Sequence, residues 1–532
     1  MAYGYRHAYF AAPPGMWQHA LTARFRQQPL FWLSAIALLP RLIAVLFSGG
    51  YFAHDDHFLV IEAAQSWVDG FDYNYWLPWN QAGEPHPSGH SFFYVGLHYL
   101  LFAGFKFLGL TDPKAIMVVV RLLHALWSLV VVRVGYRIAL RLSTPEVAWR
   151  CGLFLALFFF MPFLSVRNLV EAACVPFLML GAWQLVRTPA GPTLRNALIA
   201  GLWIGLAMNV RYQTVLFGCG AGLALLLQRN VRGALVLGLG MGVPLLLVQG
   251  GVDLAIWGRP FAEMTEYVRY NLANSTTYFN QPWYNYLPVF LGVFIPPFSL
   301  AILFGFFRRT TPLPVWLAVF SFLFFHSLFP NKQERFIFSI VPLVFVLGYV
   351  AWEQFRVGSA WWQRHRSLWR GVLAWTWALN FLLLIPLSFS YSKRERVEAM
   401  LMLRGTDVKG IIIEDTVEQD PPMLPLFYQG QWDMNQQFVT DPATDVRALR
   451  EKAPPGERAN VVFFIGVEEL DRRVQGIEAA LGPLQAIGRA EPGLLDRMMH
   501  WLNPHNRNVT ISIYAIAETE NATGQAAGRS AE

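Results

Sequence analysis

The stretch YFAHDDHFLVIE directly follows an apolar run and holds two adjacent acids, Asp55 and Asp56, between His54 and His57. A carboxylate in this place could act as a general base that takes the proton from a hydroxyl while a new bond forms. An acid pair that only keeps a helix end in water would give the same pattern. Four consecutive residues point their side chains in different directions, so a metal site is the less favoured alternative.

Further polar residues stand at the ends of other apolar runs. They are Arg167, Asn168 and Glu171 in SVRNLVEAA, Arg211 in NVRYQT, Asp253 in GGVDLAIWGRPF, and Lys332, Glu334 and Arg335 in FPNKQERF. Because Glu171 lies four residues after Arg167, a helix there would pair the two on one face. Basic residues at span ends often only extend their charge toward water. The span register given below puts these on the outer side, where Lys and Arg are normally scarce, which favours an anionic ligand such as a lipid phosphate.

Aromatic residues crowd a late loop, YFNQPWYNY, which contains Tyr278 and Trp283. Tyr and Trp are typical of the belt where a membrane protein meets the interface. Flat aromatic rings also stack on sugar rings. The sequence leaves both explanations open.

The composition is that of a multi-pass membrane protein. The chain has 532 residues, of which 55% are hydrophobic and 14% charged. Apolar runs long enough for membrane helices recur through residues 1–390. The net charge of +7 comes largely from Lys and Arg in short loops between these runs, so it predicts topology and no nucleic-acid partner.

The first span is expected near 29–48, with Arg24 and Arg26 holding the preceding segment in the cytoplasm. The run at 91–110 is expected to dip into the outer leaflet without crossing, because only then do the arginines after the next run face the cytoplasm. The first external loop is then 49–115. Further spans are expected near 116–136, 149–165, 169–186, 197–214, 215–228, 231–250, 287–307, 314–329, 336–353 and 371–390, about 11 in all.

Beyond residue 390 the composition becomes that of a soluble domain. The segments VKGIIIED, ANVVFFIGV and VTISIYAIAE predict buried strands, and TDVRALREKA and EELDRRVQGIEAALG predict helices. We therefore expect an extracytoplasmic α/β domain over 391–518, followed by a disordered tail over 519–532.

The ordered motifs resemble glycosyltransferase family 22, the lipid-phosphate-mannose-dependent α-mannosyltransferases of the GT-C superfamily. The resemblance covers about residues 25–355. It rests on YFAHDDHFLVIE, RNLVE, RYQT, DLAIWG, YFNQPWYNY and NKQERFIFSIVP. The family signature begins His-Lys-Glu, whereas this chain has Asn331, Lys332 and Gln333.

The resemblance implies a GT-C-like transmembrane catalytic domain over 1–390. It implies that Asp55, with Asp56 beside it, is catalytic. The implied substrate-binding residues are Glu62, Arg167, Asn168, Glu171, Arg211, Asp253, Tyr278, Trp283, Lys332, Glu334 and Arg335. The donor would be a polyprenyl-phosphate sugar within the membrane lipid, the acceptor a saccharide or glycolipid, and the product inverted. No metal or other cofactor is expected, because Arg and Lys can neutralise the leaving phosphate.

Two other functions remain open at this stage. A transporter or flippase of lipid-linked saccharides would carry polar residues near the midplane and often an inverted repeat, and the chain shows no repeat. A membrane anchor for a glycan-binding domain would not need charged residues in several separate loops. The expected location is an integral membrane protein with its site on the periplasmic or ER-lumenal face.

Overall fold

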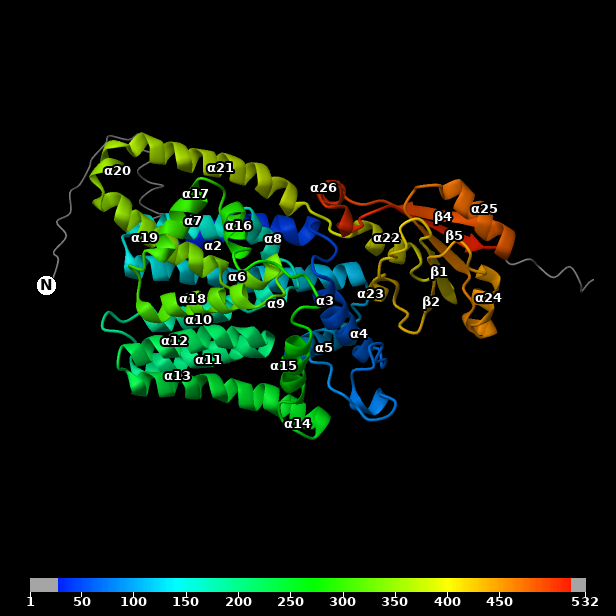
Figure 1. The fold of residues 1–532 in the computed structure, drawn as a ribbon, viewed down its shortest axis with the longest axis horizontal. Coiled ribbons are helices and arrows are strands. Elements are labelled where there is room, and N and C mark those ends of the chain that lie inside the picture. The colour runs from blue at the N-terminus through cyan, green and yellow to red at the C-terminus, as the bar shows by residue number, and fades with distance from the viewer. Residues whose placement is uncertain (1–26, 518–532) are drawn as a thin grey trace, which may run out of the picture.

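A helical bundle and a smaller α/β domain make up the computed structural model, which describes residues 27–517 (Figure 1). The two parts lie end to end, and short helices of the connecting loops lie between them. Arg24, Arg26 and the predicted tail 519–532 lie outside the described residues.

The bundle consists of apolar helices that follow the predicted runs closely. Their bounds are α2 (Pro29–Phe47), α6 (Pro113–Leu142), α7 (Pro145–Leu157), α8 (Phe160–Ser165), α9 (Val170–Ala173), α10 (Val175–Val186), α11 (Leu194–Val210), α12 (Val215–Leu227), α13 (Val231–Pro244), α14 (Gly251–Trp257), α16 (Tyr286–Val293), α17 (Phe298–Phe307), α18 (Leu313–Leu328), α19 (Val341–Gly358), α20 (Ala360–Arg364) and α21 (Arg366–Ser388).

The protein is a polytopic membrane protein by the length and apolarity of these helices. Within the described residues, four helices are long and apolar enough to cross a bilayer alone: Pro29–Phe47, Pro113–Leu142, Val231–Trp257 and Arg366–Ser388. Several shorter apolar helices lie beside them, so the number of about 11 spans stays a prediction.

Three predicted spans have interrupted helices. The run 287–307 divides into α16 and α17, with Pro296 and Pro297 at the break. The run 149–165 divides at Phe158 into α7 and α8, and the run 169–186 divides at Cys174 into α9 and α10.

Close helix packing depends on glycines that the apolar pattern alone does not single out. Helices α11 and α13 approach so closely that a Cβ on Gly240 would lie 2.4 Å from the carbonyl oxygen of Leu198. Helices α17 and α19 meet in the same way, since a Cβ on Gly305 would lie 2.1 Å from the oxygen of Gly348. These contacts fix two helix pairs side by side.

Residues 49–115, predicted to be the first external loop, fold onto the end of the bundle. They contain α3 (His54–Asp56), a π-helical turn (His57–Glu62), α4 (Ala63–Val68) and α5 (Phe92–Phe107). With 16 residues, α5 is about 24 Å long, shorter than the ~30 Å hydrocarbon core. Helix α18 also has 16 residues and α12 has 13, so the dip of the run 91–110 into the outer leaflet stays a prediction. Helix α15 (Ala262–Ala273) lies beside this loop.

The C-terminal part contains a five-stranded sheet in the order β2-β1-β3-β5-β4. Its strands are β1 (Gly410–Glu414), β2 (Asn435–Val439), β3 (Val461–Ile465), β4 (Leu484–Ala490) and β5 (Ile511–Ile516). Strand β1 runs parallel to β2 and β3, and β5 runs antiparallel to β3 and β4. The helices are α22 (Arg394–Met402), α23 (Leu426–Gln429), α24 (Val446–Glu451), α25 (Leu470–Leu481) and α26 (Leu494–Leu502).

Candidate active site

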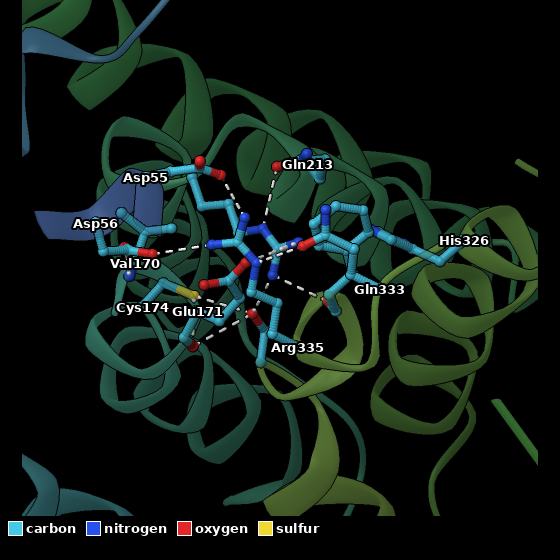
Figure 2. Close-up of polar contacts among 12 residues, drawn as sticks. Asp55, Asp56, Val170, Glu171, Cys174, Gln213, His326, Gln333 and Arg335 are labelled. Carbon is cyan, nitrogen blue, oxygen red and sulfur yellow. Dashed lines mark hydrogen bonds and ion pairs between the residues drawn. The ribbon is translucent and has the colours of Figure 1, made fainter. Parts of the chain in front are cut away.

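The guanidinium of Arg335 joins the two acids of the first external loop (Figure 2). Its Nη1 donates to Asp56 Oδ2 at 2.9 Å, its Nη2 donates to Asp55 Oδ2, and its Nε donates to Gln333 Oε1 at 2.8 Å. The acids belong to α3, and Arg335 belongs to a 3-10 turn (Glu334–Ile337) between α18 and α19. Two motifs 280 positions apart in the chain therefore form one cluster.

The two acids differ sharply in their surroundings. The side chain of Asp55 is 52% exposed, and that of Asp56 only 3%. Asp56 Oδ1 accepts a hydrogen bond from the N–H of Val170 at 2.7 Å, and its backbone oxygen accepts one from Asn168 at 2.9 Å. Burial, and to a lesser degree the charge of Glu171, raises the pKa of Asp56 to about 7. Asp56 is thus built into the structure, whereas Asp55 can meet a ligand.

Arg211 and Glu171 support the turn that carries Arg335. Arg211 Nη2 lies 3.5 Å from Glu171 Oε1, and both side chains are buried. Arg211 Nη1 donates to the backbone oxygen of Phe336 at 2.9 Å and to Ser339 Oγ at 3.1 Å. Since Phe336 directly follows Arg335, the buried pair of Arg211 and Glu171 holds the turn that carries Arg335 in place.

Lys332 and Glu334 lie at the edges of this segment. The ammonium of Lys332 donates to the backbone oxygens of Phe329 at 2.5 Å and Gln281 at 2.9 Å, and its side chain is buried. Glu334 is exposed at the start of the turn. Of Arg211, Lys332 and Arg335, the residue that contacts Asp55 and Asp56 is Arg335.

Arg167 binds elsewhere. Its Nη1 donates to the backbone oxygen of Gly49 at 2.6 Å, and its Nη2 donates to that of Ser390 at 2.9 Å. These contacts tie the end of α2 to the segment after α21. The expected helical pairing of Arg167 with Glu171 is wrong, because the turn that carries Arg167 is not helical.

Glu62 also lies apart from the two acids and is fully buried. Its Oε1 accepts a hydrogen bond from the N–H of Phe427 at 2.9 Å and lies 3.4 Å from His57 Nε2. The ring of His57 stacks on Tyr51 and Tyr428, with centroids 4.6 and 5.6 Å apart. Glu62 and His57 therefore connect the first loop to α23 of the C-terminal domain.

The described residues contain no group of three His, Cys, Asp or Glu side chains arranged to hold a metal ion. As expected from the sequence, the side chains of His54 and His57 point in different directions. His57 faces Glu62, and His54 packs on Phe58. Independence from a metal stays a prediction for activity measurements.

Asp253 belongs to a second buried acid network. Its carboxylate accepts hydrogen bonds from Gln249 Nε2 at 2.9 Å and from the N–H of Glu263 at 3.1 Å. Glu263 Oε2 in turn accepts the N–H groups of Gly89 at 2.6 Å and His90 at 3.1 Å, and the hydroxyl of Ser88 at 3.0 Å. The network fastens α15 to the first loop. Nothing in AEMTEY distinguishes Glu263 from a surface acid.

The aromatic loop lies beside the Arg335 segment. The N–H of Lys332 donates to the backbone oxygen of Phe279 at 3.0 Å. Tyr278 and Trp283 are 46% and 66% exposed, and the hydroxyls of Tyr278 and Tyr270 lie 2.5 Å apart. Exposed rings beside the candidate site suit stacking on a sugar as well as an interfacial belt.

Known proteins resemble the chain in sequence family and in fold. The Alg9-like mannosyltransferase family matches residues 32–407. The crystal structure of ArnT from Cupriavidus metallidurans bound to undecaprenyl phosphate is similar with a TM-score of 0.60 and 12% identity, over 92% of this chain and 98% of that chain. The apo state of ArnT has a TM-score of 0.58 and 13% identity with the same coverage. No curated protein matches significantly.

The family match covers well over half of the chain and includes every residue of the cluster around Arg335. The likeness in fold extends further, through the C-terminal domain, although low identity limits that comparison to the fold. This chain belongs to the Alg9-like mannosyltransferase family, with a GT-C fold, and is a membrane-bound glycosyltransferase.

Proposed function

We propose that this glycosyltransferase moves mannose from a polyprenyl-phosphate donor to a hydroxyl of a lipid-linked or glycan acceptor, on the periplasmic or ER-lumenal face. The observation that carries the proposal is the half-exposed carboxylate of Asp55 held beside the guanidinium of Arg335. A base and an anion-binding cation stand side by side there. The family description supports mannose, and the fold shared with a protein bound to undecaprenyl phosphate supports a lipid-phosphate donor.

Asp55 is the proposed general base. Its carboxylate takes the proton of the acceptor hydroxyl while the acceptor oxygen bonds to the anomeric carbon of the donor sugar. The bond from that carbon to the phosphate oxygen breaks in the same step, and the polyprenyl phosphate leaves with the electron pair. Attack opposite the leaving group inverts the anomeric centre, so a β-linked donor gives an α-linked product.

Arg335 is the proposed phosphate partner. Negative charge builds on the phosphate as it leaves, so a guanidinium placed there stabilises the transition state more than the ground state. Arg335 is paired with Asp55 and Asp56. A donor phosphate competes with Asp55 for the guanidinium and frees that carboxylate to accept a proton. The remaining bond to buried Asp56 keeps Arg335 in place.

The test is transfer by the purified full chain, supplied with polyprenyl-phosphate mannose carrying a radiolabel and with a membrane lipid extract as acceptor. Label should move to a new lipid or glycan product and should do so equally well after exhaustive chelation. If label is not transferred from the mannose donor but is transferred from another polyprenyl-phosphate sugar, that sugar replaces mannose as the proposed substrate. Rescue of chelated protein by a divalent ion would overturn the metal-free mechanism.

A further inference from the structure

A cavity of about 420 Å³ opens between the first external loop and the C-terminal domain. His54 lines it from α3, and Lys393 and Arg396 line it from the start of α22. Met423 and Arg507 line it from two loops of the α/β domain. Residues from widely separated parts of the chain therefore build one space.

The charge of this lining is largely positive. Lys393, Arg396 and Arg507 are its cations, and Asp420 is the acid among the lining residues. Arg507 already pairs with Asp415 at 2.9 Å. Arg396 lies 3.5 Å from Glu395, so among the described lining residues Lys393, directly before α22, is the cation without an ion pair.

The ammonium of Lys393 is held by neutral acceptors, and the acids Glu395 and Asp496 act on it from beyond ion-pair distance. Its ammonium donates to the backbone oxygen of Asn506 at 3.0 Å and to Asn508 Oδ1 at 2.6 Å, both neutral. Among the described residues, Lys393 makes no ion pair within 4.0 Å. Burial lowers the pKa of Lys393 to about 8, because the charged form is poorly solvated there. An anion in the cavity would supply the missing partner.

Arg396 is also incompletely satisfied. It is 9% exposed, and its buried Nε makes no hydrogen bond, although it lies 3.5 Å from Glu395 Oε1. Its Nη2 donates to the backbone oxygen of Arg507 at 3.1 Å. These contacts use only part of the five N–H donors of the guanidinium, and Arg396 lines the cavity, so further N–H groups are left for a ligand oxygen.

The cavity adjoins the candidate base through the chain itself. His54 lines the cavity, and the next residue, Asp55, pairs with Arg335. An inverting displacement places the acceptor oxygen and the leaving phosphate on opposite sides of the anomeric carbon. The two substrates therefore need separate anion-binding groups if both carry a charge, and this cavity is separate from Arg335.

We propose that the cavity beside His54 binds an anionic group of the acceptor, a phosphate or a carboxylate, and so presents the acceptor hydroxyl to Asp55. This inference rests on the proposed function and adds the chemical class of its acceptor, a headgroup with negative charge. Lys393 and Arg396 bind the anion, and the C-terminal domain contributes the opposite wall.

The first test is thermal stabilisation of the full chain in detergent by inorganic phosphate, with an Arg335→Ala background to remove binding at the donor site. Lys393→Gln should weaken the apparent phosphate affinity by roughly tenfold or more, because a charge-assisted contact is lost. Arg394→Gln is the matched control, since Arg394 is an exposed cation on the same helix outside the cavity lining. Equal affinity in all three proteins would overturn the proposal.

A second pair of variants avoids damage to existing hydrogen bonds. Met423 lines the cavity and is 48% exposed. Met423→Glu brings a negative charge to the cavity, and Met423→Gln brings a neutral group of the same shape. Phosphate affinity should fall several-fold in the Glu variant and stay near wild type in the Gln variant. The same fall in both variants would contradict an electrostatic role.

Kinetics with the lipid extract distinguish an acceptor headgroup from a free anion. Met423→Glu should raise the acceptor KM several-fold and leave the donor KM unchanged. Weaker phosphate binding with an unchanged acceptor KM would overturn the assignment to the acceptor. The phosphate titration requires no transfer, so its result stands even if the proposed function fails.

Discussion

Asp55 and Asp56 are neighbours with the same side chain, yet the fold gives them different chemistry. Asp55 is half-exposed and its pairing partner is Arg335, while Asp56 also holds the backbone of Val170 and is buried. Their place directly after the first apolar run predicted a functional role for the pair. The different roles of the two acids depend on the burial of Asp56, which comes from the contact between α9 and α3. The sequence of the pair alone does not predict this burial.

Replacement of Arg335 tests the phosphate interaction. Arg335→Ala should lower kcat and raise the donor KM, because the guanidinium neutralises charge that increases on the leaving phosphate. Removal of one such donor typically costs about 10²–10³ in turnover. Initial rates over a range of donor concentrations measure both constants.

Arg335→Lys is the control for charge alone. It should recover only part of the rate, since a single ammonium cannot bind Asp56 and a phosphate through a planar fork. Unchanged kcat and donor KM in Arg335→Ala would leave the turn a purely structural element.

Glu263 should make stability depend on pH. Burial raises the pKa of Glu263 from 4.5 to about 7. The folded protein therefore keeps this proton up to about pH 7, while the unfolded chain loses it near pH 4.5. Stability attributable to this group falls as pH rises through that window, by at most a few kcal/mol. Glu263→Gln imitates the protonated form and should flatten this slope.

Thermal unfolding of both proteins in detergent between pH 5 and pH 8 is the measurement. The variant should match wild type at pH 5 and exceed it at pH 8. A variant that is less stable than wild type at pH 8 would mean that Glu263 is charged when folded.

At the scale of elements, the sequence predicted what depends on local pattern. The predictions of strands β1, β3 and β5 are confirmed. These strands could be predicted because their apolar runs are buried, as in Ile411–Ile413. Strands β2 and β4 were not predicted, since NQQFV and LQAIGRA are polar edge strands whose residues pair with a neighbour already in place. The polar partners of Arg167 and Glu62 could not be predicted from the sequence, because those partners lie in segments hundreds of positions away.

The glycines of α13 test the contact between α11 and α13. Gly240→Ala should destabilise the protein by about 1–3 kcal/mol, because its Cβ would meet the backbone of Leu198. Gly242→Ala on the same helix has open space around the new Cβ and should be neutral or stabilising by up to about 1 kcal/mol. Thermal unfolding of the two variants side by side measures this difference. Equal midpoints would show that α11 and α13 can separate without cost.

The whole molecule places its charged loops at the two ends of the bundle. The loops after α10 and α12 lie at the end away from the C-terminal domain, whereas α3 and α15 lie near that domain (Figure 1). The predicted orientation follows if the distant loops, which carry Arg187 and Arg229, are cytoplasmic.

Cysteine labelling from outside the cell or vesicle tests this orientation. In a background without Cys151, Cys174 and Cys219, single cysteines at the exposed positions 55 and 334 and in the C-terminal domain should react with an impermeant reagent. Cysteines at 187–196 and 229–233 should react only after the membrane is opened. Reaction of position 141 from outside would mean that the run 91–110 crosses the membrane.

The central claim is that Asp55 accepts the proton during transfer from a polyprenyl-phosphate sugar. The direct measurement is the transfer rate of Asp55→Asn with a saturating donor, compared with the rate of wild type. Equal thermal midpoints of the two proteins are the control for folding. Loss of the base should reduce the rate by about 10²–10⁴ while donor binding persists. A rate near that of wild type would contradict the claim and would remove Asp55 from the chemistry.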